Sequence, residues 1–373
     1  MTYRRISVGS HVNPPPPIWA ERLPAKFRDR APRIVMRRHP QLGEIEMLAF
    51  EGREMPFNFI SADAGVASED ARPIGKSSLD GRRGGWDPAA RLVDQAADGV
   101  DGEVLLDGVT MLATPDRDLK ATMIRAYNDW LADYCAHAPD RLFGVAYLPV
   151  WDPALAVAEA HRARKLGLRG ALIPSIPGIE TPYSMPCDRQ YNDAFWDPLW
   201  STLEDLAMPA HMHVDLGTLA KEFCTDTIIL MCANKSMYSE PIAVFCCTGV
   251  LERHPQLQLV TVESGVGWMA FFVPWMDLVF ERHRHYTGYA LKEKPSFYFH
   301  RQVHGSYIQD LTGIRNREVI GVRNILWCND YPHVDGIWPN SSASIEEHMA
   351  GVPEDERHAI LAGNAVRLYG LTP

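Results

Sequence analysis

Two patterns of apolar and polar residues alternate along the chain. Short apolar runs, which are typical of buried strands, are separated by longer stretches with the apolar spacing of amphipathic helices. Together with a first run near the N-terminus, the pattern predicts eight strands. They are expected at residues 4–9, 103–107, 142–147, 170–173, 209–214, 257–263, 302–309 and 325–330.

Helices are predicted between most of these strands. They are expected at residues 87–98, 117–137, 152–165, 188–206, 225–254, 267–286 and 343–361. Alternating strands and helices indicate a parallel sheet, and eight such units indicate a closed (β/α)8 barrel of the TIM type. The chain of 373 residues suits one large barrel with an insertion. We therefore expect a single domain over residues 1–373.

The periodicity breaks after the first strand, between about residues 45 and 85, where Gly, Ser, Asp and Arg are frequent. Long segments without periodicity are often functional lids. The pattern predicts an insertion after strand one, consisting of a small hairpin and a flap.

Side chains that bind metals stand at the ends of four predicted strands: His11, His211 with His213, Glu263 and Asp330. The carboxyl ends of all barrel strands open at one mouth, so these side chains are expected to meet there. Imidazole and carboxylate ligands suit Zn²⁺, Mn²⁺, Fe²⁺ or Co²⁺. The sequence predicts a divalent metal site with the ligands His11, His213, Glu263 and Asp330. Such an ion activates water or polarises a substrate oxygen.

Asp330 ends an apolar run, and a buried carboxylate is costly unless a partner pairs with it. We expect Asp330 to move protons and His211 or His333 to orient the substrate. Three alternatives stay open. His211 could lie in a deeper layer of the barrel, and Glu263 could cap the helix that begins at Gly267. His333 and Asp335 could form a surface turn.

Charge and composition exclude several classes of partner. The net charge of −10 disfavours nucleic acid, which requires clustered Lys and Arg. No apolar run reaches the roughly 18 residues of a membrane span, and the N-terminus lacks a signal-peptide core. The seven cysteines are odd in number and contain no CxxC pair, which indicates reduced thiols. We expect a cytoplasmic enzyme with a small-molecule substrate.

Several motifs occur in a fixed order over nearly the whole chain. They are Ser10-His-Val12, Gly84-Gly-Trp-Asp-Pro88, Glu263-Ser-Gly-Val-Gly-Trp268, Asp330-Tyr-Pro-His333, Trp338-Pro-Asn-Ser341 and Asn364-Ala-Val-Arg-Leu-Tyr369. The chain resembles the amidohydrolase-related proteins grouped with aminocarboxymuconate-semialdehyde decarboxylase.

The resemblance implies a (β/α)8 barrel with a divalent metal, either Zn or one of Mn, Fe and Co. It places metal ligands on His11, His213 and Asp330. A further family ligand, two residues before His11, falls on Gly9, which has no side chain. The resemblance also implies a homo-oligomer, with a hetero-oligomer containing a paralogous subunit as the alternative.

Three hypotheses for the function follow. The first is a metal-dependent decarboxylase or hydrolase of a small carboxylate- or amide-bearing substrate. The second is a non-haem metal oxygenase of the amine N-hydroxylase type, or its subunit, because some relatives implicated in that chemistry carry Glu at the position of Glu263. The third is a degenerate, non-catalytic partner of an active paralogue, which the missing ligand at Gly9 suggests.

Overall fold

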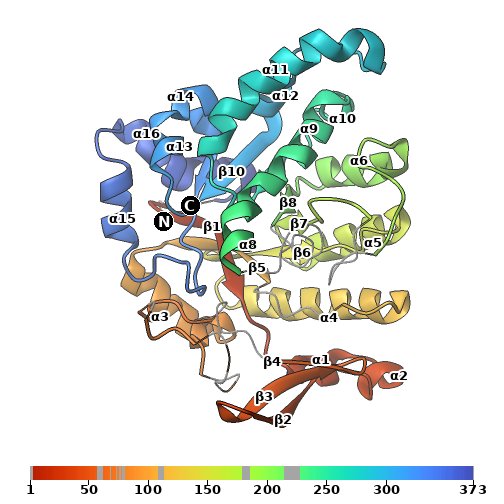
Figure 1. The fold of residues 1–373 in the computed structure, drawn as a ribbon, viewed down its shortest axis with the longest axis vertical. Helices are drawn as coiled ribbons and strands as arrows, with labels where there is room; N and C mark the ends of the chain where they lie inside the picture. The colour runs from red at the N-terminus through yellow and green to blue at the C-terminus, as the bar shows by residue number, and fades with distance from the viewer. Residues whose placement is uncertain are drawn as a thin grey trace.

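A parallel eight-stranded sheet lies at the centre of the fold (Figure 1). The computed structural model describes residues 3–56, 62–67, 69–72, 74, 77, 80–107, 113–178, 185–213 and 227–372. The strands, in chain order and in the order in which they pair, are β1 (Ile6–Val12), β5 (Gly102–Asp107), β6 (Leu142–Tyr147), β7 (Gly170–Leu172), β8 (Ala210–Met212), β9 (Leu259–Thr261), β10 (Val303–Tyr307) and β11 (Ile325–Trp327).

The sheet closes into a barrel, because its first and last strands, β1 and β11, contact each other. Ser7 on β1 donates a hydrogen bond of 2.9 Å to the side chain of Asn329, just after β11, and accepts one of 3.0 Å from its backbone N–H. Every strand of the barrel is fully buried. The predicted barrel of eight strands is confirmed.

Helices pack around the barrel (Figure 1). The longer ones are α3 (Pro88–Asp98), α4 (Arg117–Ala136), α5 (Pro153–Lys165), α6 (Asp197–Asp205), α9 (Ser239–Cys247), α11 (Gly267–Thr287), α12 (Pro295–Gln302) and α15 (Ser341–His348). The shorter ones are α1 (Pro17–Arg22), α2 (Ala25–Arg28), α8 (Thr227–Ala233), α10 (Val250–Arg253), α13 (Leu311–Arg315), α14 (Arg317–Ile320), α16 (Glu354–His358) and α17 (Asn364–Tyr369).

Aspartates fix where three of the helices begin. The side chains of Asp87, Asp116 and Asp152 each accept hydrogen bonds from the backbone N–H groups of the second and third residues of α3, α4 and α5. An N-cap of this kind stabilises a helix by about 1 kcal/mol. The helix predicted at 188–206 is shorter than expected, because one 3₁₀ turn, η3 (Ala194–Trp196), precedes α6. No helix within the described ranges is long and apolar enough to cross a membrane.

The insertion after β1 is a three-stranded antiparallel sheet of β2 (Arg33–His39), β3 (Gly43–Phe50) and β4 (Arg53–Pro56). It begins at Arg33 rather than at about residue 45, because β2 is largely exposed and has no long apolar run that would mark it as a strand. Arg30 connects it to the barrel through hydrogen bonds to Glu51 and Asp116. Much of the predicted flap (57–61, 68, 73, 75, 76, 78 and 79) lies outside the described residues.

Candidate metal centre

A local irregularity in β1 directs His11 into the barrel mouth. The pairing of β1 with β5 shifts its register between Val8 and Ser10, and Gly9 between them has a φ of 132°. Glycine adopts this conformation without steric cost, and such bulges change the direction of the following side chains. The His11 side chain is completely buried. Its backbone N–H donates a 2.7 Å hydrogen bond to the carbonyl of Tyr331, beyond β11.

Glu263 and Asp330 stand just beyond β9 and β11, in turns rather than in the strands themselves. Both have a left-handed backbone, with φ of 53° and 55°. The predicted strand ends at 263 and 330 are therefore too late. A residue other than glycine in this conformation costs on the order of 1–3 kcal/mol, and such strain is concentrated at functional sites. Here the left-handed backbone directs the carboxylates of Glu263 and Asp330 toward the same place.

Four side chains offer donor atoms that all lie within 4.8 Å of one another: His11, Glu263, Asp330 and His333. The Nε2 atom of His11 lies 2.5 Å from Oε1 of Glu263 and 3.4 Å from Oδ1 of Asp330. Nδ1 of His333 lies 2.7 Å from the same Asp330 oxygen. The two imidazole rings stack with 4.0 Å between their centroids. Three strands of the barrel therefore contribute to one cluster.

The hydrogen bonds of His11 test whether this cluster fits a metal ion. Nδ1 of His11 lies 3.0 Å from the backbone carbonyl of Asp107, which can only accept, so Nδ1 carries the proton. Nε2 then points at two carboxylates, and either a proton on this nitrogen or a cation between the three groups supplies the positive charge that they require. Ligand histidines commonly donate their other N–H to a backbone carbonyl in this way. The donor set fits a divalent cation.

Two further atoms support this fit. Nε2 of His333 is buried and has no hydrogen-bond partner among the residues that the structure describes, and Oδ1 of Asp330, although 2.7 Å from Nδ1 of His333, accepts no well-directed hydrogen bond from them. Buried polar atoms without partners are rare in proteins, and a bound ion is one explanation. Donor atoms bound to one ion at about 2.0–2.2 Å lie within roughly 4.4 Å of each other, which is close to the observed spacing.

Because Gly9 has no side chain, the side chain of Glu263 can occupy the space beside it. A Cβ atom at position 9 would lie 3.3 Å from Cγ of Glu263, 3.3 Å from Cβ of Cys328 and 3.0 Å from Cγ1 of Val262. Position 9, where the family resemblance implies a ligand, therefore faces the side chain of Glu263. Glu263 does not cap α11, because its side chain points at His11 rather than at the start of that helix.

Burial and neighbouring charges set the protonation of the cluster. Burial alone raises the pKa of a carboxyl, yet the imidazoles of His11 and His213 hold the pKa of Glu263 well below its usual range. Burial and the charge of Glu263 raise the pKa of Asp330 well above its usual range. Burial lowers the pKa of His333 to about 4, so its ring is neutral near pH 7.

His213 and His211 lie in different places although both belong to the segment of β8. Nε2 of His213 lies 3.3 Å from Oε2 of Glu263, so His213 borders the cluster. His211 lies inside the barrel, where Nδ1 donates to the carbonyl of Pro209 and Nε2 accepts from the hydroxyl of Tyr369. Both nitrogens of His211 are thus used, as in the deeper-layer alternative, and the structure does not bring His211 to the cluster.

Sequence reasoning did not identify Lys235, which reaches the cluster from η4 (Asn234–Tyr238). Its ammonium group donates a hydrogen bond to the backbone carbonyl of Glu263. The hydroxyl of Tyr238 donates a 2.8 Å hydrogen bond to the preceding carbonyl, that of Val262. An isolated lysine within η4 gives no pattern that would have shown its position.

Buried polar side chains hold β1 and the segment after β11 in place. Arg91, on α3, donates to Glu103 at 2.6 Å and to the carbonyl of His11 at 2.7 Å. Its guanidinium group lies over the ring of Tyr331. Asn329 donates to Asp98, and its own side-chain oxygen accepts from the backbone N–H of Tyr331. These contacts fix the backbone on both sides of the cluster.

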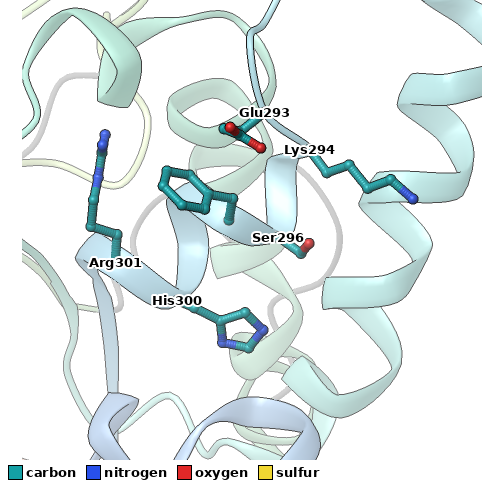
Figure 2. Close-up of a pocket in the computed structure, with 6 residues that line it drawn as sticks. Glu293, Lys294, Ser296, His300 and Arg301 are labelled. Atoms are coloured by element: carbon teal, nitrogen blue, oxygen red, sulfur yellow. The ribbon is translucent and has the colours of Figure 1, made fainter.

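A shallow depression elsewhere on the surface has a volume of about 550 Å³ (Figure 2). Its lining residues are Glu293, Lys294, Ser296, Phe297, His300 and Arg301. It lies along α12, which leads into the start of β10, whereas Glu263 and Asp330 follow the carboxyl ends of their strands. The depression is therefore at the other end of the barrel from the candidate metal site.

The amidohydrolase family model matches residues 10–371. The chain belongs to the amidohydrolase family. It is 27% identical over 305 residues to a gamma-resorcylate decarboxylase of Rhizobium sp. (strain MTP-10005), covering 76% of this chain and 87% of the relative.

Two solved structures show the same fold as this amidohydrolase. One is an amidohydrolase of Mycobacterium avium subsp. paratuberculosis K-10, with a TM-score of 0.76, 20% identity and coverage of 99% and 100% of the two chains. The other is a dihydroxybenzoic acid decarboxylase of Polaromonas sp. JS666 with bound manganese, with a TM-score of 0.65, 20% identity and coverage of 99% and 98%.

Proposed function

We propose that this amidohydrolase is a metal-dependent decarboxylase of a small aromatic carboxylate. The observation that carries the proposal is the buried cluster of His11, Glu263, Asp330 and His333 at the barrel mouth. The gamma-resorcylate decarboxylase and dihydroxybenzoic acid decarboxylase relatives support the substrate class. Of the three hypotheses from the sequence, this is the decarboxylase form of the first.

In this proposal His11, His213, Glu263 and Asp330 hold a divalent metal, and His333 lies beside them. Manganese, which the Polaromonas enzyme carries, is the first candidate, ahead of zinc, iron and cobalt. The ion supplies charge stabilisation for the oxygens of the bound substrate. The hydrogen bond from Nδ1–H of His11 to the carbonyl of Asp107 orients the ring so that Nε2 faces the ion.

The residues of the chain then perform the proton transfer. Asp330 in its acid form donates a proton to the ring carbon that bears the carboxylate. The bond from this carbon to the carboxylate breaks, its electron pair returns to the ring, and CO₂ leaves. His333, 2.7 Å from Asp330, orients that carboxyl group and the substrate. Burial of the site keeps water from competing for the proton. His211 is too deep in the barrel to take part.

The test is CO₂ release from 2,6-dihydroxybenzoate by protein loaded with Mn²⁺. We expect turnover by the wild type and a loss of at least about 100-fold in Asp330→Asn, since a positioned acid contributes about that factor or more. Asp205→Asn, on the exposed end of α6, is the matched control and should keep full activity. A wild type that binds the metal but releases no CO₂ from any dihydroxybenzoate would refute the proposal.

The same preparation separates the two rival functions. Consumption of O₂ with an amine substrate, without CO₂ release from aromatic acids, would favour the oxygenase. The degenerate-subunit hypothesis requires that this chain alone has no activity. Assembly as a homo-oligomer remains a prediction from the family resemblance, and light scattering after gel filtration measures it.

A further inference from the structure

Lys235 is held at the rim of the metal cluster by the short segment η4. Tyr238 anchors this segment to the carbonyl of Val262, and Lys235 binds the next carbonyl, that of Glu263. Asn234, beside Lys235, is buried, whereas Lys235 itself is only partly buried. The ammonium group is thus fixed beside Glu263, just beyond β9, at the mouth of the barrel.

The ammonium group of Lys235 has hydrogen-bond donors left over for a ligand. A lysine ammonium group has three hydrogen-bond donors. Among the residues that the structure describes, the carbonyl of Glu263 is its one hydrogen-bond acceptor. Two donors therefore remain for a ligand.

An anionic substrate meets an obstacle at this mouth, because Glu263 and Asp330 are both acidic. A divalent ion offsets the charge of Glu263 and, with Asp330 in its acid form, leaves one positive charge for an anion. The ammonium group of Lys235 supplies a further positive charge. Charged donors form hydrogen bonds to carboxylates about twice as strong as neutral donors do.

We propose that Lys235 binds the carboxylate of the substrate and selects aromatic acids over neutral phenols. This inference rests on the proposed decarboxylase function and adds a specificity-determining residue to it. The carboxylate accepts hydrogen bonds from the two remaining donors of the ammonium group. A product that has lost the carboxylate then loses this contact, which favours its release.

Binding of two probes to the Mn²⁺-loaded protein tests the inference. They are 2,6-dihydroxybenzoate and resorcinol, which has the same ring without the carboxylate. Lys235→Gln removes the charge and keeps a side-chain hydrogen-bond donor. We expect the Kd of the acid to rise about tenfold or more, as for the loss of a hydrogen bond to a charged group, and that of resorcinol to stay unchanged. Lys235→Arg should restore binding of the acid.

The matched control is Tyr238→Phe, which removes the neighbouring anchor of η4 without changing charge. If Lys235 merely holds the backbone, Lys235→Gln and Tyr238→Phe will change the binding of both probes alike, and the inference is overturned. Metal content and thermal unfolding, measured on each variant, exclude a misfolded protein as the cause.

The outcomes also separate this inference from the proposed function. Turnover by the wild type with equal affinity of Lys235→Gln for the acid would overturn the role of Lys235 alone. Charge-dependent binding of the acid without CO₂ release would overturn the decarboxylase function alone. A wild type that binds neither probe would overturn both.

Discussion

Replacing Gly9 by alanine tests whether the space beside β1 is what allows Glu263 into the metal cluster. The added Cβ would lie 3.0 Å from Cγ1 of Val262 and 3.3 Å from Cγ of Glu263, closer than most Cβ contacts. The residue would also keep a φ of 132°, which L side chains rarely adopt.

The two costs can be estimated separately. The unfavourable backbone conformation costs on the order of 1–3 kcal/mol. Overpacking of a close-packed interior adds typically about 1–3 kcal/mol. We therefore expect Gly9→Ala to lower the free energy of unfolding by roughly 2–6 kcal/mol. A shift of the Glu263 carboxylate should also weaken metal binding by about tenfold or more, comparable to the loss of an outer-shell contact.

Denaturant unfolding and Mn²⁺ titration measure these two effects. Gly43→Ala is the matched control, because Gly43 has a φ of 77° and a Cβ there would meet no atom within 4 Å. In Gly43→Ala only the unfavourable backbone conformation should lower the free energy of unfolding, and the metal affinity should not change. Adding Val262→Ala to Gly9→Ala should recover part of the packing cost. If Gly9→Ala is no less stable than Gly43→Ala and binds Mn²⁺ like the wild type, the reasoning about this space is wrong.

Three further predictions concern stability. Burial lowers the pKa of His304 to about 4 from its ordinary value of 6.5, so below pH 6.5 the unfolded chain binds a proton that the folded chain does not. Stability should thus fall by roughly 2 kcal/mol from this group between pH 7 and pH 5, and His304→Gln should remove that part of the pH dependence in urea unfolding. Removing Mn²⁺ with a chelator should lower the free energy of unfolding by about 2.7 kcal/mol relative to protein with free metal at 100 times the Kd; identical unfolding curves would argue against a bound ion. Arg91→Met leaves Glu103 buried and unpaired and should cost about 3–5 kcal/mol, most of which Arg91→Met with Glu103→Gln should restore in calorimetry.

The barrel could be predicted from sequence because buried parallel strands are continuous apolar runs, which stand out between amphipathic helices. The strands were found, but their ends were misplaced at Glu263 and Asp330, where the backbone turns left-handed. Apolar character shows where a strand is buried, and it does not show where its hydrogen-bond pairing stops. The exposed strand β2 was missed for the complementary reason, since it has no buried face to mark it.

The residues of the candidate site that stand at strand ends could be predicted from the sequence. His11, Glu263 and Asp330 were expected together, and the structure brings them together. His211 and His213 share a strand, but residues two apart differ by about 6.6 Å along it, enough to place one in the mouth and the other in the interior. Lys235 could not be predicted, because its position depends on how η4 docks onto the carbonyl groups of β9.

The cluster also joins distant parts of the chain. His11 and Glu263 are 252 residues apart in sequence, and Asp330 lies on the far side of the junction where β1 meets β11. An ion held by all three would act as a cross-link across the seam of the barrel, in the manner of a disulfide that closes a very long loop. Loss of the ion should therefore loosen the seam first, so faster amide hydrogen exchange should appear in β1 and β11 before it appears in β6.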